Sequence, residues 1–393
     1  MIYLFLSIVI LTLVVTYDLK KLKAGRDLWY WTIFIFFVCV AGLRYKVGGD
    51  SLEYYNSFTG QIPTLNDLSR DHFFSIRYEP FWIILNSVCK TIINDFALFQ
   101  FVHAFWINFV IFKFFKNNTQ FRFTAILVYW MFFYFYFNME ILRESIAISL
   151  FLVAYPYLSK KKWLKYYIIV ICSAMFHTSA IFLLFLPFFS SQVLNRVTLI
   201  RIAFVVVGTV FLLGVVPSIV PGSELQQRFA SYQLFTPTFT GFTYYSLIYF
   251  FGPLYLYFNY IKYRSPVFEE LVVAYFTIAG VVCYLTGFAR LINYFTPFLA
   301  VFFTNYVFLI YELKKYKQIR SLVIVGVFLI SFIPKYLYYF QDTSDLVANT
   351  HKYDLWYPYN SIFDKQENQI REQLFYRSFN NSREYLKNKN EIL

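Results

Sequence analysis

Long apolar runs recur along almost the whole chain, separated by short polar or basic segments. A helix crosses a bilayer with about 17 to 25 apolar residues, and with fewer where its ends snorkel or the bilayer thins. The pattern therefore predicts a polytopic all-α membrane protein with about twelve transmembrane helices. The predicted spans are residues 2–17, 28–43, 96–113, 123–138, 141–157, 163–176, 178–190, 201–219, 242–260, 267–286, 291–311 and 321–339.

Two segments leave room for alternatives. Residues 80–94 are apolar but carry Asn86, Lys90 and Asn94 at a helical spacing of four, which predicts a helix in the membrane interface instead of a span. Glu79 followed by Pro80 is typical of a helix start. Residues 163–190 form either a hairpin that turns at residue 177 or one tilted helix.

The basic residues predict the orientation. With residues 80–94 in the interface, six loops on one side carry 19 of the 35 lysines and arginines, and the positive-inside rule makes that side cytoplasmic. Both termini and the loops 44–79 and 220–241 then lie outside. We expect a transmembrane domain over residues 1–340 and an extracytoplasmic tail over residues 341–393.

Composition supports a lipid environment and excludes several functions. Of the 393 residues, 59% are hydrophobic and only 15% are charged, which is too apolar for a soluble protein of this length. The net charge of +13 is explained by topology, because no soluble domain could carry a nucleic-acid-binding face. No P-loop, Rossmann glycine pattern or zinc-ligand spacing occurs in a usable context, so we expect no cofactor and no metal.

The first large outer loop contains the sequence L-R-Y-K-V-G-G-D-S-L-E-Y-Y. Gly48 and Gly49 allow a bulky ligand to approach closely, and Asp50 beside them could act as a general base on a sugar hydroxyl. The alternative is a simple turn with Arg44 at the interface.

Two further arginines lie at predicted membrane boundaries. Glu140 and Arg143 share one helical face, and the planar fork of an arginine suits a phosphate. They could instead pair with each other, or Arg143 could snorkel. Arg290 stands between two apolar runs, where a charge faces water, a ligand or a counter-ion such as Glu79 or Glu140.

His177 lies at the predicted outer turn, where an imidazole could move a proton or donate to a phosphate, or serve only in packing. Arg228 lies in the outer loop 220–241. In the tail, Tyr357, Tyr359 and Asn360 belong to a cluster that could stack on sugars or form an interfacial aromatic belt. These candidates come from distant segments but share the outer boundary in the predicted topology. Arginines with carboxylates there suit a diphosphate leaving group and a hydroxyl acceptor.

Several short motifs are carried in order along residues 44–363: L-R-Y-x-V-G-x-D, E-P-F at Glu79, R-x-x-I-A at Arg143, F-H-T-S-A at His177, A-R at Arg290 with Tyr294 downstream, and Y-P-Y-x-S-I-F in the tail. Through them the chain resembles the EpsG family of Wzy-like polysaccharide polymerases.

The resemblance implies a metal- and nucleotide-sugar-independent glycosyltransferase of the bacterial cytoplasmic (inner) membrane. Its donor and acceptor would be undecaprenyl-diphosphate-linked oligosaccharides, joined at the outer leaflet into capsule, exopolysaccharide or O-antigen. It also implies a GT-C-like arrangement, and a flippase and a chain-length regulator as partners in the same pathway. On this hypothesis Arg44, Arg143 and Arg290 hold the diphosphate, and Asp50 is the base, with Glu79 or His177 as second choices. The predicted glycan-binding residues are Tyr54, Glu140, Arg228, Tyr294, Tyr357, Tyr359 and Asn360.

Three other functions remain open on the sequence. A glycan ligase would use similar groups but would make no longer chains. A flippase for lipid-linked oligosaccharides would show internal repeats and a charged central cavity. A membrane acyltransferase would show an early intramembrane His-Asp or Arg-x-x-x-Arg pattern, which the sequence lacks.

Overall fold

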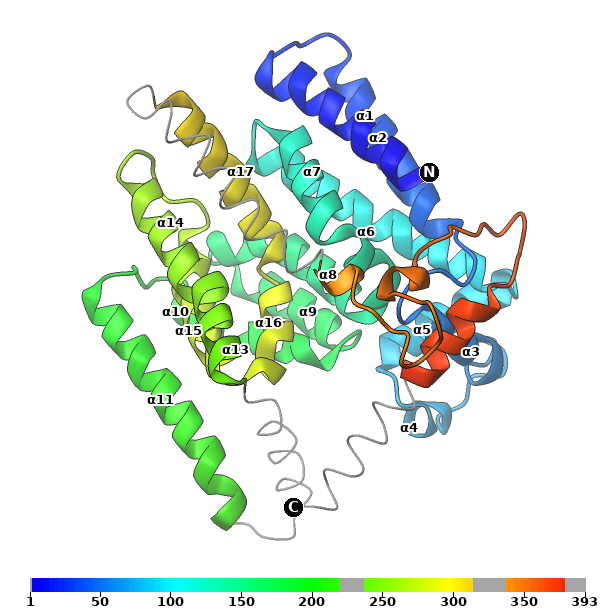
Figure 1. The fold of residues 1–393 in the computed structure, drawn as a ribbon. Helices are drawn as coiled ribbons and strands as arrows, with labels where there is room; N and C mark the ends of the chain where they lie inside the picture. Colours follow the sequence, from blue (N-terminus) through cyan, green and yellow to red (C-terminus); the bar gives the residue numbers. More distant parts are fainter. Residues whose placement is uncertain (1, 220–236, 314–336, 379–393) are drawn as a thin grey trace. The chain divides into compact units, whose positions relative to one another are not determined.

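Helices make up the regular structure of this computed structural model, which describes residues 2–219, 237–313 and 337–378 (Figure 1). Within these residues the only β-pairing is two isolated bridges, Arg44 with Ser361 and Asp342 with His351. The predicted all-α fold class is confirmed.

Two of the described helices are long and apolar enough to cross a bilayer. One is the continuous run of α1 (Ile2–Leu13) and η1 (Val14–Leu19), and the other is α6 (Phe96–Asn118). The pair α16 (Ala289–Asn293) and α17 (Thr296–Glu312) would add a third if its two arms, bent by 70°, form one broken span. The count of twelve spans stays a prediction, and residues 321–336 of the last predicted span lie outside the described residues.

Several predicted spans are interrupted helices. Residues 123–138 are divided into α7 (Arg122–Phe132) and η2 (Tyr136–Glu140). By contrast, residues 242–260 lie in a continuous helical run, in which α13 (Phe239–Tyr245) and α14 (Gly252–Ile261) flank the π-helical η4 (Ser246–Phe251). The π-helical η4 ends where Pro253 follows, and proline both lacks an N–H donor and clashes with the carbonyl of the preceding turn. Apolar composition therefore predicted where helices lie better than it predicted where they break.

The segment 163–190 is a hairpin and not one tilted helix. The helix α9 (Trp163–Ala174) ends before His177, and η3 (Thr178–Phe185) with α10 (Leu186–Phe189) follows. The Tyr166 hydroxyl donates to the Leu183 carbonyl at 2.6 Å, which ties the two arms together. The remaining described helices are α2 (Arg26–Gly42), α3 (Ser51–Gly60), α4 (His72–Ser75), α5 (Pro80–Ile92), α8 (Leu142–Ser159), α11 (Arg196–Ile219), α15 (Glu269–Tyr284), η5 (Thr286–Phe288) and η7 (Lys352–Leu355).

The chain divides into two compact units. Unit 1 contains the described residues of 1–149, 175–177 and 318–393, and unit 2 those of 150–174 and 178–317. In unit 1, α2 packs along α6, and the Tyr30 hydroxyl donates to the Phe112 carbonyl at 2.6 Å. In unit 2, α11 packs along α15.

One end of unit 1 gathers charges that the topology assigns to the cytoplasm. Asp27 pairs with Arg122 at 2.5 Å and with Lys116 at 3.5 Å. Asp18 accepts from the backbone N–H of Thr124 at 2.7 Å. The loops near residues 20 and 120 therefore meet, as the predicted topology requires of two loops on one side.

The polar side of α5 faces the protein. Asn86 is buried and its amide donates to the Trp82 carbonyl, and Lys90 Nζ donates to the carbonyls of Phe58 at 2.7 Å and Ile62 at 2.8 Å. A lysine is favourable there because the last carbonyls of α3 carry negative partial charge. The predicted helix start at Glu79 is confirmed, and the interfacial position of residues 80–94 stays a prediction. The outward side of α5 is apolar at Ile92.

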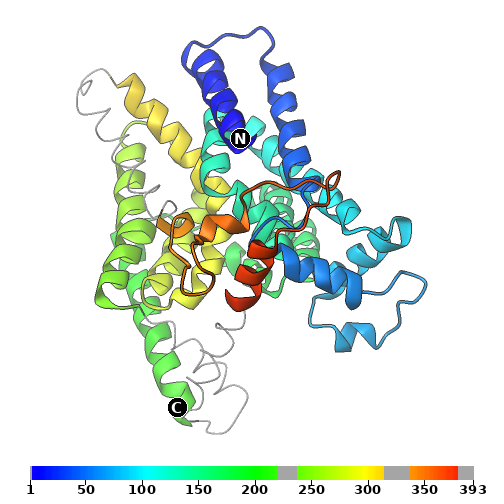
Figure 2. The ribbon, with the colours of Figure 1, turned by 45° about the vertical axis from the view of Figure 1, so that its right-hand side comes forward.

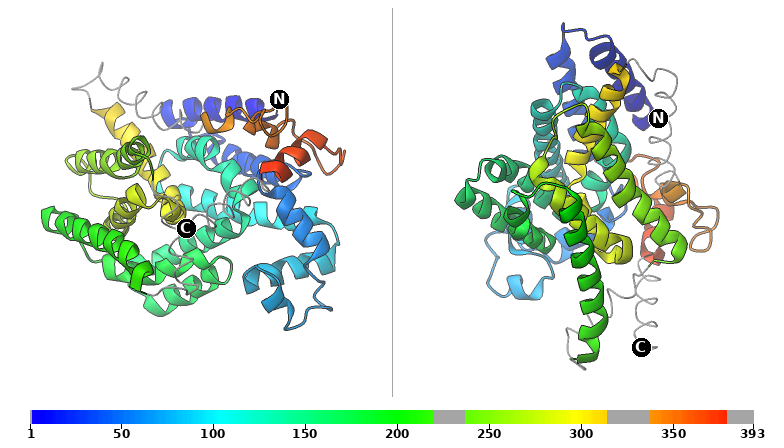
Figure 3. Two further views of the ribbon diagram at one scale, coloured as in Figure 1. Left: turned by 60° about the horizontal axis from the view of Figure 1, so that its bottom comes forward. Right: turned by 90° about the vertical axis from the view of Figure 1, so that its left-hand side faces the viewer.

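The C-terminal segment is an integral part of unit 1. Its backbone exchanges hydrogen bonds with the loop after α2: Tyr45 N–H donates to Asn360, Gly48 N–H to Leu355, and Ile362 N–H to Leu43. This segment, orange and red in Figure 2, lies beside the start of α1 in Figure 3, where the Tyr3 hydroxyl donates to the Trp356 carbonyl at 3.2 Å. Residues 341–378, predicted as a tail, therefore pack on the N-terminal helices.

A single arginine holds this segment in place. Arg371 is buried, and its guanidinium donates to the carbonyls of Asp354 at 3.2 Å, Lys46 at 3.2 Å and Pro358. Nearby, Lys46 pairs with Glu367 and Glu372, each at 2.8 Å. Both contacts join the segment to the loop that leads into α3.

We expect Arg371→Met to lower the free energy of unfolding by about 2 kcal/mol, because three carbonyls lose a charged donor. Thermal unfolding of the purified protein in detergent measures the change. The matched control is Arg377→Met, which removes an exposed arginine from the same helical stretch and should shift stability by about 0.5 kcal/mol or less. Equal effects of the two variants would contradict the assigned role of Arg371.

Candidate functional site

Four separate segments bring ionisable side chains together in unit 1. Asp50 is the N-cap residue of α3 and Glu79 is the N-cap residue of α5. Arg143 and Glu144 lie in the first turn of α8, and His177 lies in the break between α9 and η3. Helix starts suit acidic groups because the free N–H groups there carry positive partial charge.

Glu79 bridges the two cationic side chains. Its Oε2 accepts from Arg143 Nη1 at 2.6 Å, and its Oε1 lies 3.4 Å from His177 Nδ1. On the other side of the imidazole, Glu144 Oε2 lies 3.6 Å from His177 Nε2. The side chains of His177 and Glu144 are only 12% and 2% exposed, so these charges interact where water screens them weakly. Arg143 therefore forms its ion pair with Glu79 and not with Glu140.

The two carboxylates favour the protonated form of His177. Burial by itself would lower the pKa of this imidazole, but the neighbouring carboxyl groups of Glu144 and Glu79 outweigh it and raise the pKa above its ordinary value. A protonated imidazole can donate to a phosphate but cannot accept a proton as a base.

Aromatic side chains enclose the guanidinium of Arg143. Its central carbon lies 4.7 Å from the ring centroid of Tyr78, a cation–π distance. The buried Tyr54 interacts electrostatically with Arg143, and its ring centroid lies 5.3 Å from that of Trp82. Tyr54, predicted to bind glycan, thus belongs to the same cluster.

The glycine pair lets α3 start close to the segment before α8. Gly48 has a φ of 121°, and a Cβ there would lie 2.6 Å from the Met139 carbonyl oxygen. A Cβ on Gly49 would lie 3.2 Å from Glu140 Cγ and 3.5 Å from Trp356. This close approach, expected from the sequence, brings Asp50 near Glu140.

Sequence reasoning missed the residues that complete this side of the cluster. Lys352 Nζ lies 3.8 Å from the ring centroid of Tyr338 and is attracted by both Glu140 and Asp50. Burial nevertheless lowers the pKa of Lys352. Glu144 was also missed, since neither its type nor its place beside Arg143 predicts contact with His177.

Arg44 is a structural residue in the described arrangement. It is fully buried, its Nε donates to the Val47 carbonyl at 3.0 Å, and its Nη1 donates to the Ala41 carbonyl. Burial lowers its pKa to about 10, which still leaves it charged at neutral pH. Its predicted contact with a diphosphate is untested, and the geometry shows it holding the end of α2.

The other predicted residues lie elsewhere. Arg290 is an exposed residue of α16 in unit 2, and the buried Tyr294 of unit 2 shares a 2.8 Å hydrogen bond with Ser179. Arg228 lies outside the described residues. In the C-terminal segment, Tyr357 is 51% exposed, and Asn360 donates to the Gln366 carbonyl at 2.7 Å.

Tyr359, which also lies in the C-terminal segment, donates to the Val40 carbonyl at 3.2 Å. Tyr359 therefore packs on α2, and the choice between sugar stacking and an interfacial belt stays open for this cluster.

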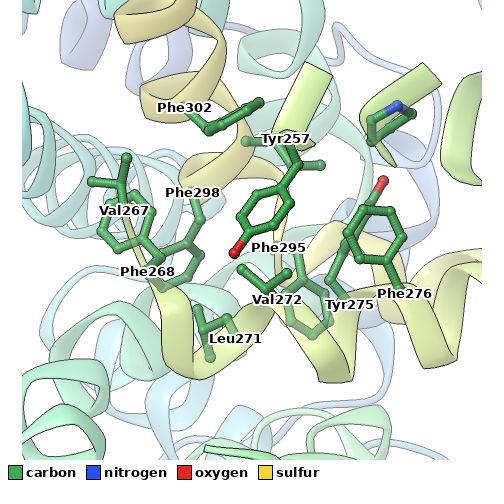
Figure 4. A pocket seen from close by; sticks show the side chains of 12 residues that line it. Tyr257, Val267, Phe268, Leu271, Val272, Tyr275, Phe276, Phe295, Phe298 and Phe302 are labelled. Carbon is green, nitrogen blue, oxygen red and sulfur yellow. The ribbon is translucent and has the colours of Figure 1, made fainter. Parts of the chain in front are cut away.

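Unit 2 contains a small apolar pocket with a cavity volume of about 60 Å³ (Figure 4). Its walls are side chains of α14, α15 and α17, including Tyr257, Leu271, Tyr275 and Phe298. None of its lining residues is charged, so it offers no acid or base. In the part of the chain that the structure describes, no three His, Cys, Asp or Glu side chains gather as a metal site would need.

Comparison with known proteins identifies a family. The family model described as EpsG family matches residues 27–361, which is most of the chain. No curated protein and no solved structure matches the chain.

The charge of His177 should make stability depend on pH. Because its pKa is higher in the folded protein than the ordinary 6.5, its stabilising effect is complete below that value and is lost as pH rises through the raised pKa. We expect the thermal unfolding midpoint to fall as the pH rises above about 6.5, and His177→Gln to weaken that dependence. The control His72→Gln, in the short helix α4, should leave it unchanged; an unchanged dependence in His177→Gln would contradict the assignment.

Proposed function

The chain belongs to the EpsG family, and from this premise we propose that it is a membrane glycosyltransferase that polymerises undecaprenyl-diphosphate-linked oligosaccharide repeat units. The product would be capsular polysaccharide, exopolysaccharide or O-antigen, made at the outer leaflet of the bacterial cytoplasmic membrane. The proposal includes about twelve spans in a GT-C-like arrangement. The observation that carries it is the meeting of Tyr54, Glu79, Arg143 and His177, from four separate segments, in one cluster.

The cations of this cluster suit the leaving group. When the glycosidic bond to phosphate breaks, negative charge grows on the diphosphate, and a fixed guanidinium and imidazolium stabilise it without rearranging. Glu79 orients Arg143 and keeps His177 charged, so it acts as a positioning residue. Arg290 stays a predicted second guanidinium for the diphosphate.

Asp50 is the proposed base. The acceptor hydroxyl oxygen forms a bond to the anomeric carbon of the donor, and the bond from that carbon to the phosphate oxygen breaks. The diphosphate leaves with the electron pair, and the hydroxyl proton passes to the Asp50 carboxylate. Asp50 is exposed, so the proton can continue to water. Glu79 and His177 are less suitable, because Glu79 faces Arg143 and His177, and the pKa shift of His177 favours its protonated form.

Exposed apolar side chains support a site beside lipid. In the outer loop and on α5, Phe74 is 79% exposed, and Leu65, Ile92 and Ile93 are also exposed. Such residues are stable in the headgroup region of a bilayer, where they gain burial. An interfacial position would keep the cluster at the level of a lipid-linked diphosphate. The bilayer is therefore one proposed partner, and a flippase and a chain-length regulator are others.

The proposed sidedness can be tested by labelling. In a cysteine-free background, we expect a membrane-impermeant maleimide to label Asp71→Cys but not Lys23→Cys on intact spheroplasts, because the positive-inside rule places the first outside. Both positions are exposed in the structure, so lysis should make both react. Labelling of Lys23→Cys before lysis would reverse the topology.

The enzymatic proposal rests on the forked geometry of Arg143. We expect Arg143→Lys to lower polymer formation by about tenfold or more, because lysine keeps the charge but cannot donate two parallel hydrogen bonds. The assay incubates purified protein with synthetic lipid-diphosphate repeat units and scores chain length on a gel.

The matched control is Arg77→Lys, at an exposed arginine that pairs with Glu53. It should retain activity. Full polymer formation by Arg143→Lys at normal protein level would remove its role. If the unaltered protein transfers only one repeat unit and makes no series of longer chains on the gel, it is a ligase.

A further inference from the structure

Four charged side chains of unit 1 follow one another in a closed series of contacts. Arg143 pairs with Glu79 at 2.6 Å, and Glu79 faces His177 Nδ1 at 3.4 Å. The other imidazole nitrogen, His177 Nε2, faces Glu144 Oε2 at 3.6 Å. Glu144 directly follows Arg143 in the first turn of α8, so the backbone closes the series. We call these four residues the ionic ring.

The backbone beside His177 is held in place without charged groups. The N–H of Phe81, in the first turn of α5, donates to the Met175 carbonyl at 3.1 Å. The rings of Phe81 and Phe176 also pack together, with centroids 5.7 Å apart. These contacts fix residues 175–177 against α5. They leave the imidazole of His177 to be oriented by other groups, because the last torsion angle of a histidine side chain has a broad, roughly two-fold preference.

Two carboxylates select one orientation of this imidazole. Glu79, from the start of α5, faces Nδ1, and Glu144, from the start of α8, faces Nε2. Turning the imidazole over would put carbon atoms at both carboxylates, and a C–H group is a much weaker donor than an N–H group. Arg143 lies behind Glu79 and completes the charged groups of the ionic ring.

The place of Glu144 follows from the geometry of its helix. Successive residues of an α-helix point about 100° apart, so two neighbours reach different partners. At the start of α8, Arg143 reaches Glu79 and Glu144 reaches His177. The first turn of α8 therefore holds a guanidinium through its own backbone and an imidazole through Glu144, which sets the spacing of the two cations.

We propose that Glu144 is a positioning residue, which holds the imidazole of His177 in one orientation and at a fixed place relative to Arg143. The proposal rests on the proposed glycosyltransferase function, in which these two cations stabilise the leaving diphosphate. Charge that develops while a bond breaks is stabilised best by groups that are already in place. The side chain of Glu144 is 2% exposed, so it acts through His177 and not by contact with the substrate.

Histidine NMR tests the contact without any substrate. The chain has four histidines, so in histidine-labelled full-length protein in detergent the signals of His177 are identified by their loss in His177→Gln. Glu144→Gln keeps the shape of the side chain but removes its charge, and we expect the pKa of His177 to fall. The control Glu53→Gln removes a carboxylate that pairs with the exposed Arg77, and it should leave the titration of His177 unchanged.

Transfer kinetics test the role in the reaction. With synthetic lipid-diphosphate repeat units, we expect Glu144→Gln to lower kcat by about tenfold with little change in KM, because the lost interaction acts on charge that develops in the transition state. The loss should grow as the pH rises, because His177 then releases its proton at a lower pH than in the unaltered protein. Glu53→Gln should retain full activity.

An unchanged titration of His177 in Glu144→Gln would overturn the proposal, and so would a shifted titration with undiminished transfer. If Glu144→Gln does not fold, Glu144→Asp draws the carboxylate back by one methylene, and a smaller change in the same direction is expected in both measurements. A shifted titration in a protein whose unaltered form makes no polymer would leave the contact of Glu144 with His177 standing and count against the proposed function alone.

Discussion

The ionic bridge at Glu79 is the contact on which the candidate site in unit 1 depends. Its two carboxylate oxygens face Arg143 and His177, which belong to α8 and to the break after α9. Both cations are largely buried, and an unpaired charge is strongly unfavourable in such a place. The bridge therefore joins three segments of the chain and, in the same contacts, sets the charges that a phosphorylated substrate would meet.

The C-terminal segment imposes the second constraint. Arg371 donates to carbonyls on both sides of the gap between the loop after α2 and the segment at 354–358. Backbone hydrogen bonds from Tyr45 and Gly48 add to this connection. Asp50 and Lys352 are thereby brought within electrostatic reach, although nearly the whole chain separates them in sequence.

Residue type and predicted sidedness were sufficient to select much of the candidate site. Asp50, Glu140 and Arg143 were selected because a charged side chain at a membrane boundary is unfavourable unless it has a partner or a function. The structure places all three residues in unit 1. Pairing could not be predicted, because the contact of Glu144 with His177 depends on the path of the chain. Arg44 illustrates the same limit: a buried arginine that donates to carbonyls has the same local sequence pattern as one that binds a phosphate.

The two sides of the cluster differ in a way that transfer chemistry requires. Around His177, two cations and two carboxylates balance in a place with little water, which favours stabilising charge that develops during bond breaking. Asp50 is exposed, which favours taking up a proton and releasing it to water. Tyr54 interacts with both Asp50 and Arg143, so these two environments adjoin. A hydroxyl acceptor and a diphosphate leaving group could therefore meet there without either environment cancelling the other.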